Sequence, residues 1–445
     1  MAIITQIMKL MIVYTPREEV IVSKLFSQNP QILVDLYTGI KNPALESRVS
    51  NVFGVSNADF DHLQNDKPSV ILLGPDHFSI AGYKEKLAEH GLSAIGSSQE
   101  QIKAETDRSY LRNRFPGLQR YFPPYEIINE YNPDKIASIL DNYSEYAVKY
   151  NGVYPQIGGG TKISGIHLQS QNEALAYIKS SIDECGKVVI EKKIDGIDFS
   201  VNAISAKDGS VFFFPENYCY KLRNDGNAGP NTSGTGSFAF ADLLPFLNEQ
   251  NREDARRITC EVVDHMNSIS DVPFVSGLNL DFRVDSNQQI HLFEVNARFA
   301  GSGTLSTVMD LCDNNLFGIL DQSQNGTFKN VPFKKKNDCS VSVFTFPSFF
   351  PLDDENDVRV QIPRYTAMPN DINCYTGWID AKGETAKSYD AFLKNSTTLL
   401  LQTSGKTMDD CRNRVYAEMA KLPSELEYRT DVGDLSASFL KKLIH

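Results

Sequence analysis

Residues 277–282 read Gly-Leu-Asn-Leu-Asp-Phe and residues 292–298 read Leu-Phe-Glu-Val-Asn-Ala-Arg, and these two stretches decide the fold. Polar and apolar side chains alternate in both, as they do in β-strands that bury one face. The turn-forming residues between them predict a hairpin. Pairing of the two strands would place Asp281, Glu294 and Asn296 side by side on one face.

Oxygen ligands that converge in this way suit Mg²⁺ or Mn²⁺ bridging the phosphates of a nucleotide. Arg298, one pleat beyond Asn296, is placed to neutralise charge on a transferred phosphoryl or acyl oxygen. The polar face of an exposed hairpin is the alternative, but it accounts poorly for three oxygen ligands and an arginine in register. We therefore predict a metal site at Asp281, Glu294 and Asn296.

A second, weaker signal is a lysine followed by a run of glycines. Lys149 lies near the end of a predicted strand at 146–150, and Gly158, Gly159, Gly160 and Thr161 come after it. Such a lysine can reach phosphate oxygens, and the amides of a glycine loop can cover them. A plain loop explains the glycines equally well.

Two further segments are ambiguous when read alone. The predicted strand 188–191 runs into a connection whose amides could meet an adenine edge, and Asp198 beyond it could hold ribose hydroxyls. The loop 229–236 contains Asn231 and follows Lys221. This loop could cradle a small acid or its phosphate, or be a long turn.

The order of predicted elements indicates an α/β protein with α+β lobes. To about residue 120, strands alternate with helices, which favours a parallel sheet covered on both faces. The strands there are 10–14, 31–37, 69–73 and 92–95, and the helices are 18–27 and 80–90. Beyond this part we expect helices at 133–142 and 254–268, a long alternating stretch at 199–214, and strands at 146–150, 188–191, 277–284, 290–295 and 339–346.

The composition is that of a globular protein. The 445 residues are 41% hydrophobic and 22% charged, with a formal net charge of −12. This acidic balance argues against nucleic acid as a partner, because a phosphate backbone needs a basic face. No apolar run approaches membrane-spanning length, so we expect no membrane partner. The seven cysteines show no metal-type spacing, which is typical of reduced thiols and favours a cytoplasmic protein.

In the order Lys149, glycine run, Glu191, Asp281 and Glu294-x-Asn296, the chain resembles the ATP-grasp superfamily. Over nearly its whole length it is similar to phosphoribosylamine–glycine ligase of purine biosynthesis. The shared motifs are Leu-Gly-Pro-Asp at 73–76, Gly-Pro-Asn-Thr-Ser-Gly at 229–234, Glu-Val-Asn-Ala-Arg-Phe at 294–299 and Tyr-Arg-Thr-Asp-Val-Gly at 428–433. The second and third motifs, at this separation, are a specific combination.

The resemblance implies an ATP-grasp fold in four parts. These are a Rossmann-like domain at 1–120, a small lobe over the ATP at 121–195, a large lobe with the metal and acyl-phosphate site at 196–336, and a C-terminal domain at 337–445. The implied cofactors are ATP and Mg²⁺ (or Mn²⁺), with the metal on Asp281, Glu294 and Asn296.

The resemblance also implies roles for single residues. The ATP phosphates would lie against Arg108, Lys149 and the run Gly158 to Thr161, with Arg108 in the place of a family lysine. The adenine would lie near Glu191, Lys192 and Ile194, and the ribose at Asp198. The implied catalytic side chains are Arg298, Lys221 and Asn231.

The chain departs from the family where the family binds its own substrates. The N-terminal loop GxGGREHA reads Tyr-Thr-Pro-Arg-Glu-Glu-Val at 14–20, so a proline replaces flexible glycine. The segment RFGDPET reads Arg-Phe-Ala-Gly-Ser-Gly-Thr at 298–304 and loses an acid. The segment GGRVL reads Ser-Thr-Thr-Leu-Leu at 396–400 and lacks the arginine.

Three readings follow. The first is a ligase that joins a small carboxylic acid, such as an amino acid, to a small amine through an acyl phosphate, with substrates other than those of purine synthesis. The second is a genuine phosphoribosylamine–glycine ligase. The third is a nucleotide-binding protein that has lost catalysis. The sequence leaves open whether the protein is a monomer or a homodimer.

Overall fold

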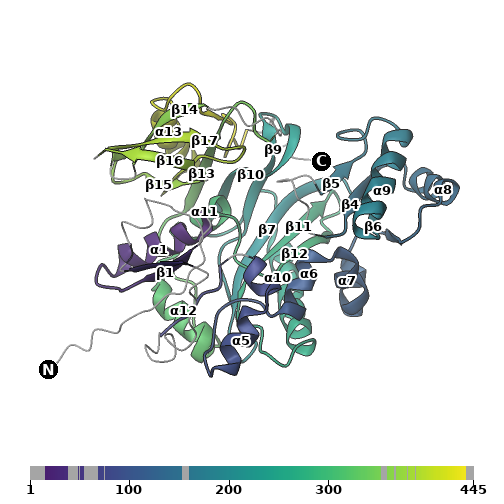
Figure 1. The fold of residues 1–445 in the computed structure, drawn as a ribbon, viewed down its shortest axis with the longest axis horizontal. Helices are drawn as coiled ribbons and strands as arrows, with labels where there is room; N and C mark the ends of the chain where they lie inside the picture. Colours follow the sequence, from purple (N-terminus) through teal and green to yellow (C-terminus); the bar gives the residue numbers. More distant parts are fainter. Residues whose placement is uncertain are drawn as a thin grey trace.

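The computed structural model describes residues 16–38, 49, 51–54, 69–74, 76–152, 160–351, 358–364, 367–377, 379–385 and 387–436. The predicted strand 10–14 and two members of the glycine run, Gly158 and Gly159, lie outside these ranges. A large sheet forms the centre of the molecule, and a smaller lobe lies to one side of it (Figure 1).

The large sheet has ten strands, with a main path in the order β12-β11-β7-β9-β10-β13-β18-β15. The strands are β7 (Gly196–Ser205), β8 (Val211–Phe213), β9 (Asn217–Asn224), β10 (Ala228–Phe240), β11 (Gly277–Asp285), β12 (Ile290–Asn296), β13 (Cys339–Phe346), β15 (Asn373–Thr376), β18 (Leu399–Gly405) and β19 (Glu427–Tyr428). The predicted hairpin is confirmed, because β11 and β12 are antiparallel neighbours. The alternating stretch 199–214 forms β7 and β8, which pair with each other.

The two faces of this sheet differ in character. One face carries apolar side chains such as Phe199 and Leu280, which share a core with Val262 of helix α10 (Glu249–Ser268). The other face carries polar side chains, among them Asn279 and Asp281. An antiparallel sheet commonly buries one face in this way and leaves the other for polar groups. Helix α10 begins five residues before the predicted start, at a capping box between Asn248 and Asn251.

The smaller lobe is a four-stranded sheet in the order β3-β6-β4-β5, with two helices packed on it (Figure 1). Its elements are β3 (Tyr125–Ile128), α8 (Pro133–Tyr143), β4 (Tyr146–Tyr150), β5 (Thr161–Ile163), α9 (Gln171–Cys185) and β6 (Val188–Lys192). Apolar residues of both helices share one core with Val148 and Ile190. The predicted elements at 133–142, 146–150 and 188–191 are confirmed.

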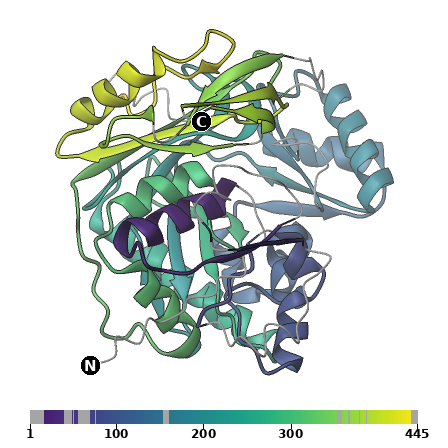
Figure 2. The same ribbon diagram turned by 60° about the vertical axis from the view of Figure 1, so that its left-hand side comes forward.

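The N-terminal part contains mostly helices in its described residues. These are α1 (Pro16–Gln28), α4 (Asp76–Ile80), α5 (Tyr83–Glu89), α6 (Gln99–Thr106), α7 (Arg108–Arg114) and the 3-10 helix η2 (Pro116–Tyr121), with a parallel pair of strands β1 (Asp35–Thr38) and β2 (Asn51–Gly54). Helix α1 lies against α11 (Ser302–Asp310) and α12 (Leu316–Asn325) of the large lobe (Figure 2).

Three predictions for this part need correction. The strands expected at 69–73 and 92–95 meet only at a single parallel bridge, between Leu72 and Ile95. The strand expected at 31–37 is β1, which begins four residues later. The helix expected at 80–90 is interrupted at Gly82, which has a left-handed backbone conformation with a φ of 72°. Helix α4 ends before this glycine, and helix α5 begins after it.

The C-terminal part continues the large sheet, since β13 pairs with both β10 and β18. The boundary at residue 337 therefore remains a prediction. A three-stranded sheet, β14 (Arg359–Pro363), β17 (Ser388–Leu393) and β16 (Ile379–Glu384), and helix α13 (Met408–Met419) complete this part. None of the helices in the described ranges has the length and apolar character needed to cross a membrane.

A buried arginine attaches the end of the described chain to the large sheet. Arg429 is fully buried and donates from Nε and Nη2 to the carboxylate of Asp431, at 2.8 and 2.7 Å. Its Nη1 donates to the carbonyl oxygen of Leu222 at 2.7 Å. Because Leu222 lies on β9 next to Lys221, this ion pair also supports the strand that carries a candidate catalytic lysine.

Replacing Arg429 by methionine should lower the free energy of unfolding by about 3–5 kcal/mol, because the carboxylate of Asp431 loses its buried partner. Chemical denaturation measures this change, and adding Asp431→Leu should restore part of the loss. Arg359→Met is the control, since the Arg359–Asp390 pair is exposed and its loss should leave the midpoint nearly unchanged. Equal effects of the two substitutions would contradict the anchoring role of Arg429.

Candidate functional site

A cleft of about 750 Å³ separates the small lobe from the polar face of the large sheet. Lys149 and Thr161 line it from the small lobe, and Asp281 and Glu294 line it from the sheet. Most of the predicted site residues therefore come together here. Those that line the cleft are Arg108, Lys149, Gly160, Thr161, Lys192, Asp198, Lys221, Asn231, Asp281, Glu294, Asn296 and Arg298.

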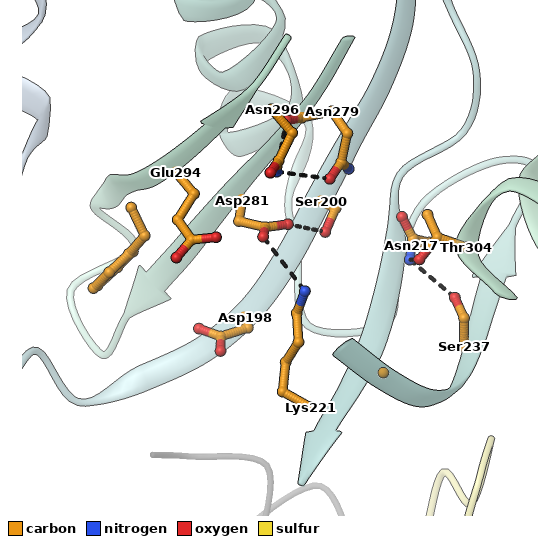
Figure 3. Close-up of polar contacts among 12 residues, drawn as sticks. Asp198, Ser200, Asn217, Lys221, Ser237, Asn279, Asp281, Glu294, Asn296 and Thr304 are labelled. Atoms are coloured by element: carbon orange, nitrogen blue, oxygen red, sulfur yellow. Dashed lines mark hydrogen bonds and ion pairs between the residues drawn. The ribbon is translucent and has the colours of Figure 1, made fainter. Parts of the chain in front are cut away.

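The register of β11 and β12 places the predicted oxygen ligands together. Asp281 pairs with Glu294, and Asn279 pairs with Asn296. Figure 3 shows the side chains of Asp281, Glu294 and Asn296 on one face of the two strands. Asp281 accepts a hydrogen bond of 2.6 Å from Ser200 Oγ, and its other oxygen is 3.5 Å from Lys221 Nζ.

Neighbouring cations keep the carboxylate of Glu294 ionised. Burial disfavours the charge on Glu294, but the charges of Arg108, Lys149 and Lys221 outweigh burial and lower its pKa to about 2. Arg108 Nη1 lies 2.8 Å from Glu294 Oε1. The carboxylate of Asp281 in turn raises the pKa of Lys221. Glu294 is therefore available as an anionic ligand at neutral pH.

This set of donors fits a magnesium ion that a nucleotide also holds. The described ranges contain no group of three or more His, Cys, Asp or Glu side chains that could hold a metal by themselves. Mg²⁺ is usually bound by one or two carboxylates together with water and substrate phosphates. Asp281 and Glu294, with the amide oxygen of Asn296, are the side chains that could supply such ligands.

A buried cluster sits beneath the small-lobe side of the cleft. Glu191 is fully buried, and its carboxylate contacts Lys149 Nζ at 2.6 Å and the guanidinium of Arg112. Burial and the positive charges of Arg112 and Arg108 hold the pKa of Lys149 well below its ordinary value. Because the side chain of Glu191 does not reach the cleft, its observed contacts position Lys149 and Arg112.

Asp198 is held by an arginine that the sequence analysis did not single out. Arg283 donates to both carboxylate oxygens of Asp198, at 2.6 and 3.0 Å, and to the carbonyl oxygen of Ile194 at 2.7 Å. Arg283 could have been found from the sequence, since it follows Asn279 and Asp281 at the same spacing of two in β11. Arg112, buried in α7, gives no such signal.

Arg298, which follows the end of β12, forms ion pairs with two acidic residues. Its Nε lies 2.8 Å from Asp76 Oδ1, and its Nη2 lies 2.8 Å from Glu105 Oε1. Burial lowers the pKa of Arg298, but the charges of Glu105 and Asp76 more than compensate and raise it. The guanidinium is thus fixed and charged beside Asn296, whose Oδ1 is 3.5 Å from Nη2.

Comparison with known proteins agrees with this geometry. Residues 107–304 match the family model described as phosphoribosylglycinamide synthetase, ATP-grasp (A) domain. A phosphoribosylamine–glycine ligase of Methanosarcina barkeri is 28% identical over 65% of this chain and 66% of its own length. Another, of Pyrococcus furiosus, is 27% identical over 88% of this chain and 87% of its own length.

Solved structures show the same architecture. The crystal structure of phosphoribosylamine–glycine ligase from Thermotoga maritima has a TM-score of 0.74 at 17% identity, covering 96% of this chain and 100% of that one. That of N5-carboxyaminoimidazole ribonucleotide synthetase from the same organism has a TM-score of 0.60 at 12% identity, covering 95% and 99%. The chain therefore has the ATP-grasp fold and resembles phosphoribosylamine–glycine ligase.

The buried cluster under the cleft yields a prediction. Glu191→Gln should lower the free energy of unfolding by about 3–5 kcal/mol, because Arg112 and Lys149 lose their shared buried carboxylate. Thermal and chemical denaturation measure the loss. Glu145→Gln is the control on the same lobe, since Glu145 is 57% exposed in its pair with Lys193. Wild-type stability in Glu191→Gln would show that the carboxylate does not hold the two cations.

Proposed function

We propose that this ATP-grasp ligase, an enzyme that forms C–N bonds, joins glycine to phosphoribosylamine at the expense of ATP. The observation that carries the proposal is the cleft, in which paired carboxylates and several cations face a lobe that can cover a nucleotide. The curated relatives named above support the choice of substrates. Their names favour this second reading of the sequence over the first, and they favour either enzymatic reading over the third.

In the proposed reaction, a carboxylate oxygen of the acid attacks the γ-phosphorus of ATP and ADP leaves. The amine nitrogen then attacks the acyl carbon, phosphate leaves, and the nitrogen loses a proton. The acyl phosphate would hydrolyse in open water, so the reaction needs a covered site. The cleft of about 750 Å³ between the two lobes is where such a cover could form.

The side chains around the cleft can bind and orient the reactants. Arg108 and Lys149 face the carboxylate edge from the small-lobe side and suit the ATP phosphates. Asp281, Glu294 and Asn296 would hold Mg²⁺ or Mn²⁺, which neutralises phosphate charge when bound. Lys221 and Arg298 are positioned to meet charge that develops on the acyl or phosphoryl oxygens.

The far end of the cleft favours a second candidate, a ligase for a different polar acid. The hydroxyl-bearing residues here are Ser302, Thr304, Ser396 and Thr397, each 7–8% exposed. The first pair stands in the segment where the family has an acid, and the second pair directly precedes Thr398, which stands where the family has an arginine. Hydroxyl groups suit a neutral polar group better than the charged ends of glycine and a sugar phosphate.

The first experiment measures ADP release with Mg-ATP across a panel of amino acids and small carboxylic acids, with hydroxylamine as the amine. We expect hydroxamate from glycine, since hydroxylamine would capture its acyl phosphate. Hydroxamate from another acid, with none from glycine, would replace the first candidate by the second. The absence of both ADP and hydroxamate with every acid would refute both candidates.

Removal of a proposed metal ligand should abolish this turnover. We expect Glu294→Ala and Asn296→Ala each to lower Mg²⁺-dependent ADP release by roughly 100-fold or more, with the fold intact by circular dichroism. Glu253→Ala, at an exposed position of α10, is the control and should keep full activity. Normal activity in either cleft variant would rule out the metal assignment.

A further inference from the structure

Four asparagine side chains form a continuous row of hydrogen bonds across the large sheet, which we call the amide ladder. They are Asn296 on β12, Asn279 on β11, Asn202 on β7 and Asn217 on β9. The row ends at Ser237 on β10 and Thr304 on α11, and Figure 3 shows its first link, from Asn296 to Asn279, and its last, from Asn217 to Ser237. The ladder thus crosses five neighbouring strands and begins at a proposed metal ligand.

Every link of the amide ladder donates in the same direction. Asn296 Nδ2 donates to Asn279 Oδ1 at 3.1 Å, and Asn279 Nδ2 donates to Asn202 Oδ1 at 3.2 Å. Asn202 Nδ2 donates to Asn217 Oδ1 at 2.7 Å. Asn217 Nδ2 then donates to Ser237 Oγ at 2.9 Å and to Thr304 Oγ1 at 3.3 Å.

The far end of the ladder fixes this direction. Ser237 Oγ donates to the backbone carbonyl of Tyr218 at 2.9 Å, which leaves the oxygen of Ser237 to accept from Asn217. A backbone carbonyl can only accept, so each amide between it and Asn296 has one favourable orientation. The Nδ2 group of Asn296 therefore points into the ladder.

The carbonyl oxygen of Asn296 is left outside the ladder. It lies on the same face as Glu294 and Asp281, and its recorded polar contact is with Arg298 Nη2 at 3.5 Å. Asn296 Nδ2 also donates to the backbone carbonyl oxygen of Asn279 at 3.2 Å, so Asn279 holds this amide by two contacts. A turned amide would present its NH₂ group to the cleft. An NH₂ group cannot bind a cation, so the orientation of Asn296 decides whether it can act as a ligand.

Stability alone is a poor explanation for the amide ladder. Asn202 and Asn217 are 2% and 0% exposed, and burying amides is costly unless every donor and acceptor is paired. On the opposite face of the same strands the positions are apolar, as at Val201 and Leu280, and pack with α10. The presence of asparagines on neighbouring strands is explained if they serve to orient the side-chain amide of Asn296 at the end of the ladder.

We propose that Asn202 and Asn217 are positioning residues, which act through Asn279 to hold the carbonyl oxygen of Asn296 toward the metal bound with the nucleotide. This inference rests on the proposed function, because it assumes that Asn296 is a metal ligand. It assigns a task to buried residues that never touch the nucleotide. Hydrogen-bond partners of metal ligands commonly set the affinity for the metal in this way.

The test measures binding and not turnover. Titration calorimetry with a non-hydrolysable ATP analogue is carried out with Mn²⁺ and again with a chelator. Asn202→Leu should weaken binding by about 10–100-fold with Mn²⁺ and leave metal-free binding unchanged. Asn202→Ser, a smaller change at the same position, is measured in parallel in case the larger side chain impairs folding. In the Asn296→Ala background, either substitution should have no further effect.

Asn314→Leu is the matched control. Asn314 is also buried, and its amide donates to the carbonyl oxygen of Pro332 at 2.9 Å and accepts from Lys334 N at 2.7 Å. The Asn314→Leu variant should lose about as much stability as Asn202→Leu, but its binding of the ATP analogue should still depend on Mn²⁺. Equal weakening with and without Mn²⁺, or additive effects with Asn296→Ala, would overturn the positioning role. If Mn²⁺ does not strengthen binding to the wild-type protein, the proposed metal site itself fails.

Discussion

The pairing of β11 with its two neighbours determines the whole cleft face. On one side it places Asp281 opposite Glu294 and Asn279 opposite Asn296. On the other side it places Ser200, Asn202 and Asp198 of β7 opposite Asp281, Asn279 and Arg283. Each of these cross-strand pairs with β7 is also a side-chain contact. A shift of one residue in either pairing would turn an entire set of polar side chains into the apolar core.

The charges on this face are arranged so that each carboxylate holds at least one cation. Glu294 contacts Arg108, Asp198 contacts Arg283, and Asp281 lies 3.5 Å from Lys221. On the small lobe, Glu191 contacts both Arg112 and Lys149. Glu191 carries one charge for two buried basic side chains, and burial together with the charges of Arg112 and Arg108 lowers the pKa of Lys149. In the proposed function, an anion such as a phosphate group at the cleft would favour the charged form of Lys149.

The sequence predicts local patterns well and long-range neighbours poorly. The alternation at 277–282 and 292–298 predicts both the hairpin and the face of its polar residues, because strand period and turn chemistry are local. Nothing in the sequence shows that β7 lies next to β11, since the two strands are some 80 residues apart and any alternating strand could occupy that position. The contacts of Asp198 with Arg283, and the amide ladder, were missed for this reason. The resemblance implies that Glu191 lies near the adenine, and this stays a prediction. The contacts of its side chain with Arg112 and Lys149 are also non-local, so the sequence could not show them.

The division of the large sheet into two unlike faces explains how stability and function coexist in it. The apolar face packs with α10 in one hydrophobic core, and this burial stabilises the strands. The cleft face can then carry carboxylates, cations and amides without having to form a core. This arrangement is stable only if the buried polar groups pair with one another. They do so through the hydrogen bonds of the amide ladder and through the ion pairs. The polar network therefore has to be complete before any ligand arrives, and a ligand then finds its partners already oriented.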